Sequence, residues 1–539
     1  MFSGRARFKS PNLLIAGFFA LVILIVFKTF QDYGVTWDEE YHQLYGDSIL
    51  SWYGSFFKDR SVLDFPAFSM SGGFFDTLAQ LAGRKLPFGV YETRHLLGAL
   101  FGLWTIFMSF RIAEHLSGYL AGFLTVLFLT LHPVFYGHMF NNPVDIPFGA
   151  LLLTTLYLIL KSYDDLPRIP LKNLLQIGIA LGLMLGERIG GVLIVLPCIL
   201  VCWSLWFPQN RKPFGAGAKD MLRNFGWIFA VAWPAMLMWC PLAQINPLIN
   251  PLRAAFKAAH HDFLGNMTFF YEGNYLIASD LPKSYNVKLI LLTLPEFFLI
   301  ALFLGVVDLI RHAIKLPKLT AKSAKTGTLI FACLFPIATA SLLTVQFDGY
   351  RHILFSIPLL AVLGGVSVTA FLHSKAARWA KLFLSSVLII SMGLTALDMY
   401  RLHPYQTVYF NRLLAGGLAK AAKNYDTDYW GNSYREGILW LIQNYNWPPD
   451  KKIKILNASK AFQTGYYLEK SPELRNRFDM FDNDTDRNPD PDIFLSTTRW
   501  NCYKAFRGKI LYQVERDKTP LLYVIEVSEN TRMTPVPTC

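Results

Sequence analysis

The sequence predicts a polytopic α-helical membrane protein that carries a small α/β domain at its C-terminal end. Three observations support this fold class. Of the 539 residues, 53% are hydrophobic and only 17% are charged, whereas charged residues make up about a quarter of a typical soluble chain. The apolar residues lie in long blocks, and about 20 apolar residues span a bilayer as a helix. The net charge of +13 comes from short basic clusters between these blocks, a pattern that is typical of cytoplasmic loops.

The first apolar block covers residues 13–27 and follows a short basic segment. No small-residue cleavage site follows this block, so we expect an uncleaved first helix with a cytoplasmic N-terminus. A mostly polar loop over residues 31–91 then lies outside the cytoplasm. Within it, residues 39–53 and 74–83 have helical patterns that are too short and too polar to span a bilayer. These two segments are expected to lie on the membrane surface.

Ten further apolar blocks predict ten more spans. They cover residues 95–111, 120–135, 146–160, 174–185, 191–207, 225–242, 289–310, 328–345, 353–372 and 382–397. With this assignment, every Lys- and Arg-rich loop falls on the same side of the membrane. The positive-inside rule therefore favours about eleven transmembrane helices, with the N-terminus in the cytoplasm and the C-terminus outside it.

The composition changes to that of a soluble domain after residue 398. We therefore expect a membrane module over residues 1–398 and an extracytoplasmic α/β domain over residues 399–539. Alternating apolar residues and turn residues predict its elements. They are a helix at 437–446, strands at 453–456 and 492–495, and a hairpin formed by 509–513 and 521–527. Cys502 and Cys539 lie in this domain, where an oxidising compartment permits a disulfide between them.

Three adjacent acids, Asp38, Glu39 and Glu40, open the first outer loop directly after the first span. A carboxylate at this place can act as a general base toward a hydroxyl group. The alternative is that Asp38 or Thr36 caps the helix that follows, because Asp and Thr are favoured at N-caps and acids are favoured in the first helical turn.

A second polar segment joins the third and fourth spans on the same outer side. It contains His138, Asn141, Asn142 and Asp145. Asp145 lies at the mouth of an apolar helix, where an ionisable residue is a candidate functional group. Asn142 and His138 add hydrogen-bonding capacity that suits a sugar or a phosphate. The alternative for Asp145 is again a helix cap.

Fixed positive charge lies on the same side at Arg94, Arg188 and Arg351, and His352 follows Arg351 directly. Arginine binds phosphate oxygens in a bidentate manner, so convergence of these side chains would hold a lipid phosphate. The alternative is that each arginine extends to the membrane interface by itself.

Other ligand classes are disfavoured. The basic residues form no stripe with interleaved aromatic residues, so nucleic acid is not expected as a partner. No Gly-rich phosphate loop and no serine nucleophile elbow is present, which argues against a nucleotide-driven enzyme. The adjacent His260, His261 and Asp262 are expected to be solvated loop residues, and no metal and no cofactor is predicted.

These motifs, taken in order, resemble those of the GT-C membrane glycosyltransferases. Asp38-Glu39 after the first span resembles their first-loop acidic motif, and Asn142-Pro143-Val144-Asp145-Ile146-Pro147 their second acidic site. Tyr350-Arg351-His352-Ile353-Leu354 resembles their entry to a late span. The nearest resemblance is to glycosyltransferase family 39, which includes dolichyl-phosphate-mannose protein mannosyltransferases and lipid A aminoarabinose transferases. His403-Pro404-Tyr405 and Asp428-Tyr429-Trp430-Gly431 resemble a bacterial branch of this group.

The resemblance implies transfer of a hexose or pentose from a polyprenyl-phosphate carrier to an acceptor hydroxyl, with inversion, at the outer face of a bacterial inner membrane. Asp38 would match the general base, Glu39 its neighbour and Asp145 the second acid. Arg94 and Arg351 would match the groups that hold the phosphate, with His352 assisting. The partners would be the lipid-linked donor, membrane lipids, and an acceptor lipid, glycan or protein. The chain departs from the family in its third acid, Glu40, and in lacking a β-trefoil-like insertion, which weakens the case for a protein acceptor.

Three alternatives remain at this point. A transporter or flippase would place charged or broken helices at mid-membrane and would show inverted repeats, whereas the acids here lie at the outer rim and no repeat is seen. A ligase that uses a diphosphate-linked oligosaccharide would share the fold and differ in the donor. A non-catalytic assembly scaffold would use the acids only as helix caps.

Overall fold

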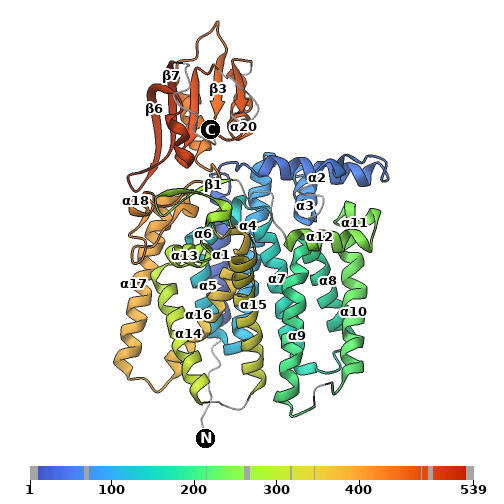
Figure 1. Cartoon of the computed structure of the whole chain (residues 1–539). Helices are drawn as coiled ribbons and strands as arrows, with labels where there is room; N and C mark the ends of the chain where they lie inside the picture. Colours follow the sequence, from blue (N-terminus) through green and yellow to red (C-terminus); the bar gives the residue numbers. More distant parts are fainter. Residues whose placement is uncertain are drawn as a thin grey trace.

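The computed structural model shows a bundle of long helices with the C-terminal domain on one of its ends (Figure 1). It describes residues 10–65, 72–213, 215–259, 267–315, 319–344, 346–474, 476–482 and 490–529. The loops that join α9 (Val192–Gln209) to α10 (Ala218–Leu237) and α16 (Ser356–His373) to α17 (Arg378–Leu402) lie at the end of the bundle opposite the C-terminal domain.

Nine single helices build most of the bundle. They are α1 (Ser10–Thr29), α4 (Val90–Ser117), α7 (Asp145–Lys161), α8 (Leu171–Glu187), α9 (Val192–Gln209), α10 (Ala218–Leu237), α15 (Ala321–Leu343), α16 (Ser356–His373) and α17 (Arg378–Leu402). The boundary expected after residue 398 falls in the last turn of α17. Long apolar stretches explain why these segments form helices, and the prolines inside α9, α10 and α15 do not end them.

Two further segments are bent pairs of helices. The pair α5 (Tyr119–Thr130) and α6 (Pro133–Asn141) bends by 69°, and α13 (Tyr285–Thr293) and α14 (Glu296–Lys315) bend by 120°. Pro133 begins α6 and Pro295 directly precedes α14. Proline lacks the N–H that would continue the preceding helix, so each break has a local cause.

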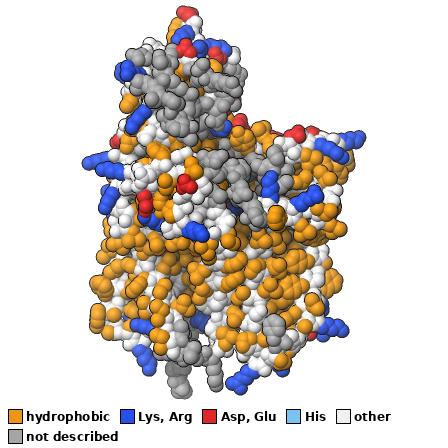
Figure 2. All heavy atoms as spheres, in the orientation of Figure 1, with side chains coloured by type: hydrophobic (Ala, Val, Ile, Leu, Met, Phe, Trp, Pro, Cys, Tyr) orange, Lys and Arg blue, Asp and Glu red, His pale blue; other side chains and the backbone are white. Residues whose placement is uncertain are grey.

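Each of the eleven expected spans coincides with a helix or with a bent pair. Within the described part of the chain, six helices are long and apolar enough to cross a membrane, or up to eight if each bent pair is one span. The fold class is thereby confirmed, whereas the number of eleven stays a prediction. Hydrophobic side chains cover the middle of the bundle, and Lys and Arg lie near its ends (Figure 2). This distribution suits a bilayer around the bundle.

The first outer loop folds as expected into two helices. The helix α2 (Glu39–Gly54) lies across the end of the bundle, and α3 (Phe74–Gly83) packs against it (Figure 1). Smaller elements that were not predicted lie at the same end of the bundle. They are α11 (Pro241–Ile245), α12 (Ile249–Ala259) and an antiparallel pair of strands, β1 (Thr268–Tyr271) and β2 (Asn274–Ile277).

The C-terminal domain is built on a five-stranded sheet in the order β4-β3-β5-β7-β6. The predicted strands are present as β3 (Ile453–Asn457), β5 (Ile493–Thr497), β6 (Arg507–Arg516) and β7 (Thr519–Glu529), and the predicted helix as α19 (Tyr434–Asn444). The strand β4 (Phe478–Asp482) and the helices α18 (Leu418–Ala421) and α20 (Phe462–Glu469) were not predicted. β3 runs parallel to β4 and β5, whereas β7 is antiparallel to β5 and β6.

Four cysteines, Cys198, Cys202, Cys240 and Cys333, are free and buried in the helical bundle. Cys502 is disulfide-bonded. Its expected partner, Cys539, lies outside the described residues.

Candidate active site

Asp38 and Arg351 form an ion pair at the end of the bundle that carries the C-terminal domain. Asp38 occupies the N-cap position of α2, yet its side chain makes no capping hydrogen bond. Its Oδ2 instead lies 3.3 Å from Nη1 of Arg351, in the short helical turn Arg351–Ile353 before α16. The Asp38 side chain remains 29% exposed. Burial raises the pKa of Asp38, and Arg351 opposes that rise. The carboxylate is therefore held by a cation and open on one side.

Asp348 connects Arg351 to the C-terminal domain. Its Oδ2 accepts a hydrogen bond from Nη2 of Arg351 at 3.2 Å, and its Oδ1 accepts one from Nη2 of Arg499 at 2.7 Å. Asp348 and Gly349 have positive φ angles of 50° and 68°, which make the sharp turn between α15 and Arg351. Asp38, Arg351, Asp348 and Arg499 thus form a chain of alternating charges.

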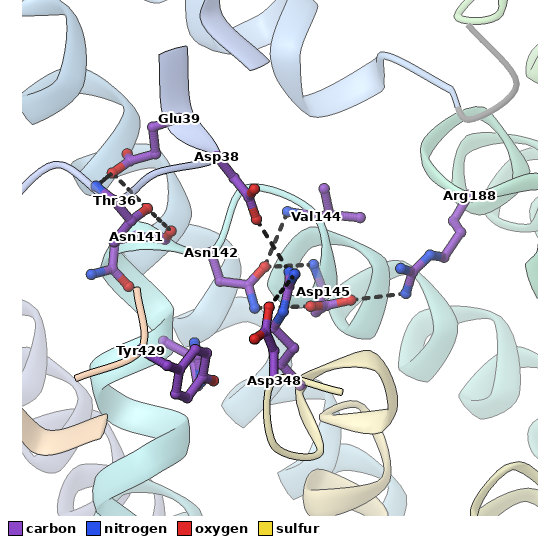
Figure 3. Close-up of polar contacts among 12 residues, drawn as sticks. Thr36, Asp38, Glu39, Asn141, Asn142, Val144, Asp145, Arg188, Asp348 and Tyr429 are labelled. Atoms are coloured by element: carbon purple, nitrogen blue, oxygen red, sulfur yellow. Dashed lines mark hydrogen bonds and ion pairs between the residues drawn. The ribbon is translucent and has the colours of Figure 1, made fainter. Parts of the chain in front are cut away.

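Asp145, the first residue of α7, is buried beside this chain. Its Oδ1 accepts a hydrogen bond from Nη1 of Arg188 at 2.8 Å, and its Oδ2 accepts one from Nδ2 of Asn142 at 3.0 Å. Oδ1 of Asn142 accepts the backbone N–H groups of Val144 and Asp145 at 3.3 and 2.9 Å. The N-cap residue of α7 is Val144, and the Asn142 side chain, rather than that of Asp145, accepts the N–H groups at the start of the helix. Asp38, Asp145 and Asp348 approach one another from three separate segments (Figure 3).

Glu39 has different surroundings from its neighbour Asp38. It is 1% exposed, and its Oε2 accepts hydrogen bonds from the backbone N–H and the hydroxyl of Thr36 at 2.7 and 3.1 Å. Its Oε1 lies 3.0 Å from Nε2 of His95 on α4. Figure 3 shows its carboxylate directed toward Thr36 and away from Asp145. These contacts make Glu39 a group that fixes the start of α2 on the bundle.

Glu40 faces the C-terminal domain. Burial raises its pKa, Asp482 raises it further and Lys460 opposes the rise. Both of these neighbours belong to the C-terminal domain. Of the three consecutive acids, Asp38 is the one that pairs with Arg351, which separates their roles in a way that the sequence could not.

Aromatic side chains and His138 enclose Arg351. The guanidinium carbon of Arg351 lies 4.7 Å from the ring centroid of Trp430. His138, on α6, is buried, packs edge-on against Trp430 at 5.1 Å, and has its Nε2 3.5 Å from the hydroxyl of Tyr429. The ring of His352 packs against Phe347 at 4.4 Å. His138 and Arg351 are therefore brought together around Trp430.

Arg94 belongs to a second polar cluster, under α2 and α3. It is fully buried and pairs with Asp76 of α3, and Asp76 also lies 2.8 Å from Nδ1 of His42 on α2. Burial tends to raise the pKa of Asp76, but His42 and Arg94 outweigh it and lower that pKa. The charge of Arg94 is thus already balanced by a buried carboxylate, and its contacts are separate from those of Arg351.

A cavity adjoins Arg351 on the side of the β1–β2 hairpin. Its polar wall includes His138, Asp348, Arg351 and Tyr429. The rest of the lining is largely apolar and aromatic and comes from Val134, Phe270, Tyr271, Tyr285, Leu289, Tyr350, Phe410 and Tyr425, with Thr293, Gly349, Thr407, Asp426 and Thr427. Arg351 is the only Lys or Arg among these described lining residues. Asp38 and Asp145 do not line the cavity, so Arg351 lies between Asp38 and this space.

Sequence reasoning missed three residues of the site: Asp348, Tyr429 and Arg499. Asp348 and Tyr429 lie within segments that were singled out, but nothing in the pattern distinguishes them from loop residues. Arg499 follows a strand in the C-terminal domain and has no local signal. Within the described residues, no group of three His, Cys, Asp or Glu side chains could hold a metal ion. His260, His261 and Asp262 lie outside those residues.

The helical bundle, the helices α2 and α3 across one of its ends and the C-terminal domain at the same end define a polytopic membrane protein with a GT-C type fold. Residues 88–239 match the sequence profile of the dolichyl-phosphate-mannose-protein mannosyltransferase family. These residues include Arg94, His138, Asn142 and Asp145, but not Asp38 or Arg351. No curated protein sequence matches the chain.

Solved structures of two proteins, ArnT and the archaeal oligosaccharyltransferase AglB, are among those that resemble the chain. The apo crystal structure of ArnT from Cupriavidus metallidurans matches with a TM-score of 0.52 and 14% identity, covering 96% of this chain and 98% of that chain. The same protein bound to undecaprenyl phosphate gives 0.49 and 14%, with coverages of 97% and 100%. The archaeal oligosaccharyltransferase AglB from Archaeoglobus fulgidus, with an inhibitory peptide and a dolichol-phosphate, gives 0.48 and 13%, covering 86% and 63%.

Proposed function

We propose that this protein is a membrane glycosyltransferase that moves a sugar from a polyprenyl-phosphate carrier to an acceptor hydroxyl. The observation that carries the proposal is the position of Arg351. It pairs with the partly exposed carboxylate of Asp38 on one side and borders the cavity on the other. A cation beside both a carboxylate and a cavity suits transfer from a phosphate ester, because the carboxylate can take the acceptor proton while the cation offsets the charge that develops on the phosphate.

The proposed reaction is a single displacement. The acceptor oxygen forms a bond to the anomeric carbon of the sugar, and the bond from that carbon to the phosphate oxygen breaks. The electron pair of the breaking bond stays on the phosphate, and the acceptor proton goes to the carboxylate of Asp38. Arg351 stabilises the negative charge that develops on the phosphate. Attack from the face opposite the leaving group inverts the anomeric configuration.

Asp145 and Arg188 act beside this centre in the proposal. Arg188 neutralises Asp145 at 2.8 Å, and Asn142 orients the other oxygen of that carboxylate. A buried carboxylate with both oxygens already bound is poorly suited to take up a proton, so the role of base belongs to Asp38. Asp145 and Asn142 are assigned to binding sugar or acceptor hydroxyl groups, and His138 to the polar wall of the cavity.

The charge of the cavity favours a monophosphate over a diphosphate donor. Among the described lining residues, one arginine faces two carboxylates, Asp348 and Asp426, and no lysine is present. A diphosphate carries more negative charge and would call for further cations or a metal ion. The ligase reading is therefore the second candidate, and it would be favoured by transfer from a diphosphate-linked glycan.

The expected location of the site is the extracytoplasmic face. The helix α2, which Asp38 precedes, and the C-terminal domain lie at one end of the bundle (Figure 1). The basic loops between α9 and α10 and between α16 and α17 lie at the other end. By the positive-inside rule, that end faces the cytoplasm.

The test uses the purified protein in detergent with a panel of radiolabelled polyprenyl-phosphate sugars and a membrane extract as acceptor. Wild type is compared with Asp38→Asn and with Glu40→Gln as a matched control, because Glu40 is an adjacent acid that faces the C-terminal domain. We expect transfer by wild type, about 100-fold or greater loss in Asp38→Asn, which removes the general base, and near-normal transfer in Glu40→Gln.

The outcomes separate the alternatives. Full activity of Asp38→Asn would contradict its assignment as the base while leaving the activity itself established. Transfer only from diphosphate-linked glycans would establish the ligase reading. Failure of folded wild type to consume any donor would contradict the proposed activity.

A further inference from the structure

Arg499 is a buried arginine that the C-terminal domain contributes to the site. Its side chain is 5% exposed and makes two strong contacts. Nη2 donates to Asp348 Oδ1 at 2.7 Å, and Nη1 donates to the backbone carbonyl of Tyr429 at 2.8 Å. Its guanidinium carbon lies 5.2 Å from the ring centroid of Trp37, the residue before Asp38. Arg499 thus contacts both segments that carry the proposed catalytic pair.

The backbone directly after Arg499 adopts a conformation of raised energy. Trp500 and Asn501 follow Arg499 with φ angles of 56° and 58°, which cost energy for residues other than glycine and persist where the surrounding structure enforces them. The ring of Trp500 lies 4.4 Å from the guanidinium carbon of Arg499. Arg499 therefore lies between two tryptophan rings, Trp37 and Trp500, and faces Asp348.

The docking of the C-terminal domain does not depend on this contact alone. Lys470 of that domain pairs with Glu92, in the first turn of α4, at 2.7 Å, and the hydroxyl of Tyr466 donates to the same carboxylate. These groups are more exposed than Arg499 and lie away from Arg351. Burial of the Arg499 charge beside Asp348 carries a desolvation cost that docking of the domain does not require. This cost points to a role of Arg499 in the site itself.

We propose that Arg499 is a positioning residue that completes the active site. By neutralising Asp348, it leaves the guanidinium of Arg351 shared between Asp348 and Asp38. The effect of Arg499 on catalysis rests on the proposed function. Its effect on the ion pair between Arg351 and Asp38 rests on the geometry alone. It makes the C-terminal domain a part of the reaction centre.

Removal of the Arg499 charge has a definite expected effect on Asp38. Asp348, deprived of one of its two cations, binds Arg351 more strongly and draws it away from Asp38. Asp38 then loses part of the attraction that favours its ionised form. The charged groups that act on Asp38 are Arg351, His42, Asp348 and Asp145, and Arg499 also acts on Asp426 at the cavity wall. With the other groups unchanged, Asp38 should take up its proton at higher pH in Arg499→Gln.

Three variants test the inference. Arg499→Gln removes the charge, Arg499→Gln with Asp348→Asn removes both partners, and Lys470→Gln removes a docking ion pair elsewhere as the matched control. Transfer is measured across pH. Independently of activity, the protonation of Asp38 is followed by the infrared carboxyl band that disappears in Asp38→Asn. Thermal unfolding in detergent shows whether each variant is folded.

We expect Arg499→Gln to lower kcat/KM by about 10- to 100-fold, the effect of a small misplacement of catalytic groups, and to move the Asp38 titration and the acid limb of activity to higher pH. The double variant should return the titration toward wild type, and Lys470→Gln should stay within about twofold.

An unchanged Asp38 titration in folded Arg499→Gln, or an equal effect of Lys470→Gln, would overturn the inference. If wild type transfers no sugar but the titration still moves, the proposed function fails and the coupling of Arg499 to Asp38 stands.

Discussion

Asp38 and Arg351 lie 313 residues apart in the sequence and pair at 3.3 Å between the start of α2 and the entrance to α16. Arg351 shares its second terminal nitrogen with Asp348, so one guanidinium bridges two carboxylates. Because Arg351 also borders the cavity, an anion that enters the cavity competes with these carboxylates for the same cation. The pair therefore predicts effects on both donor binding and proton transfer.

Arg351→Gln should weaken binding of undecaprenyl phosphate by about tenfold or more, because it removes a charge-assisted contact to the phosphate. Arg351→Lys should retain part of the affinity, since it keeps the charge and loses the bidentate geometry. Binding is measured on purified protein by titration calorimetry, with Arg188→Gln as the control that changes an arginine paired with Asp145. Equal affinity of wild type and Arg351→Gln would contradict the assignment.

The activity should fall on the acid side at a pH above the ordinary pKa of an aspartate. Burial raises the pKa of Asp38, and the base works only when it is deprotonated, so activity is present above this raised pKa and is lost as the pH falls through it. Arg351 opposes the rise, so Arg351→Lys, which keeps the charge, should change the acid limb less than Arg351→Gln. The measurement is the pH dependence of kcat/KM. An acid limb at the pKa of an exposed aspartate would show that another group is titrating.

Arg94→Gln should destabilise the fold more than it impairs donor binding. It leaves the buried carboxylate of Asp76 without its arginine and with the His42 ring still beside it, and breaking a buried ion pair costs about 3–5 kcal/mol. Because the folded pKa of Asp76 is lowered, its contribution to stability is present above the unfolded pKa and is lost as the pH falls through the folded one. Thermal unfolding in detergent at neutral pH tests this. Loss of undecaprenyl-phosphate binding without loss of stability would instead support a direct role of Arg94 at the phosphate.

Asn142→Ala should lower stability by about 0.5–1.5 kcal/mol, because the Asn142 side chain accepts the N–H groups at the start of α7. It should also impair transfer, since Asp145 loses the amide that orients its carboxylate. Asn142→Asp keeps the accepting oxygen but places a second negative charge beside Asp145, so it should retain more of the stability than of the activity. Thermal unfolding and transfer rates are measured on the same preparations. Equal stability of wild type and Asn142→Ala would show that these hydrogen bonds do not stabilise the start of α7.

Apolar runs and turn residues predict most of the fold because they act locally. The long helices of the bundle and the hairpin β6–β7 follow from patterns within a few residues of each other. The strand β4 (Phe478–Asp482) is not predicted because its apolar and polar residues alternate only weakly. Its hydrogen-bonded neighbour is β3, a parallel strand earlier in the chain, so no local turn marks the pairing. The apolar blocks 120–135 and 289–310 predict single spans, whereas each is a bent pair of helices. A proline, Pro133 or Pro295, lies at each bend.

The candidate site was predicted in part for the same reason. Asp38, Asp145 and Arg351 stand out because charge is unusual beside apolar spans. Glu39 could not be separated from Asp38, since adjacent residues at a helix start point in different directions and only the packing against His95 shows which one is enclosed. Arg499 carries no local signal, because its meaning depends on a contact with Asp348 that the folded chain alone creates.

The ion pair between Arg499 and Asp348 also has a consequence for the order of synthesis. A ribosome makes Asp38, Arg351 and Asp348 long before it reaches Arg499. If Arg499 completes the site, insertion of the helical bundle into the membrane precedes the arrival of the last charge. A nascent chain, or one cut short before residue 499, would carry Asp38, Arg351 and Asp348 and still lack the charge that neutralises Asp348. The complete charge arrangement around Asp38 would thereby form only after the C-terminal domain has been made.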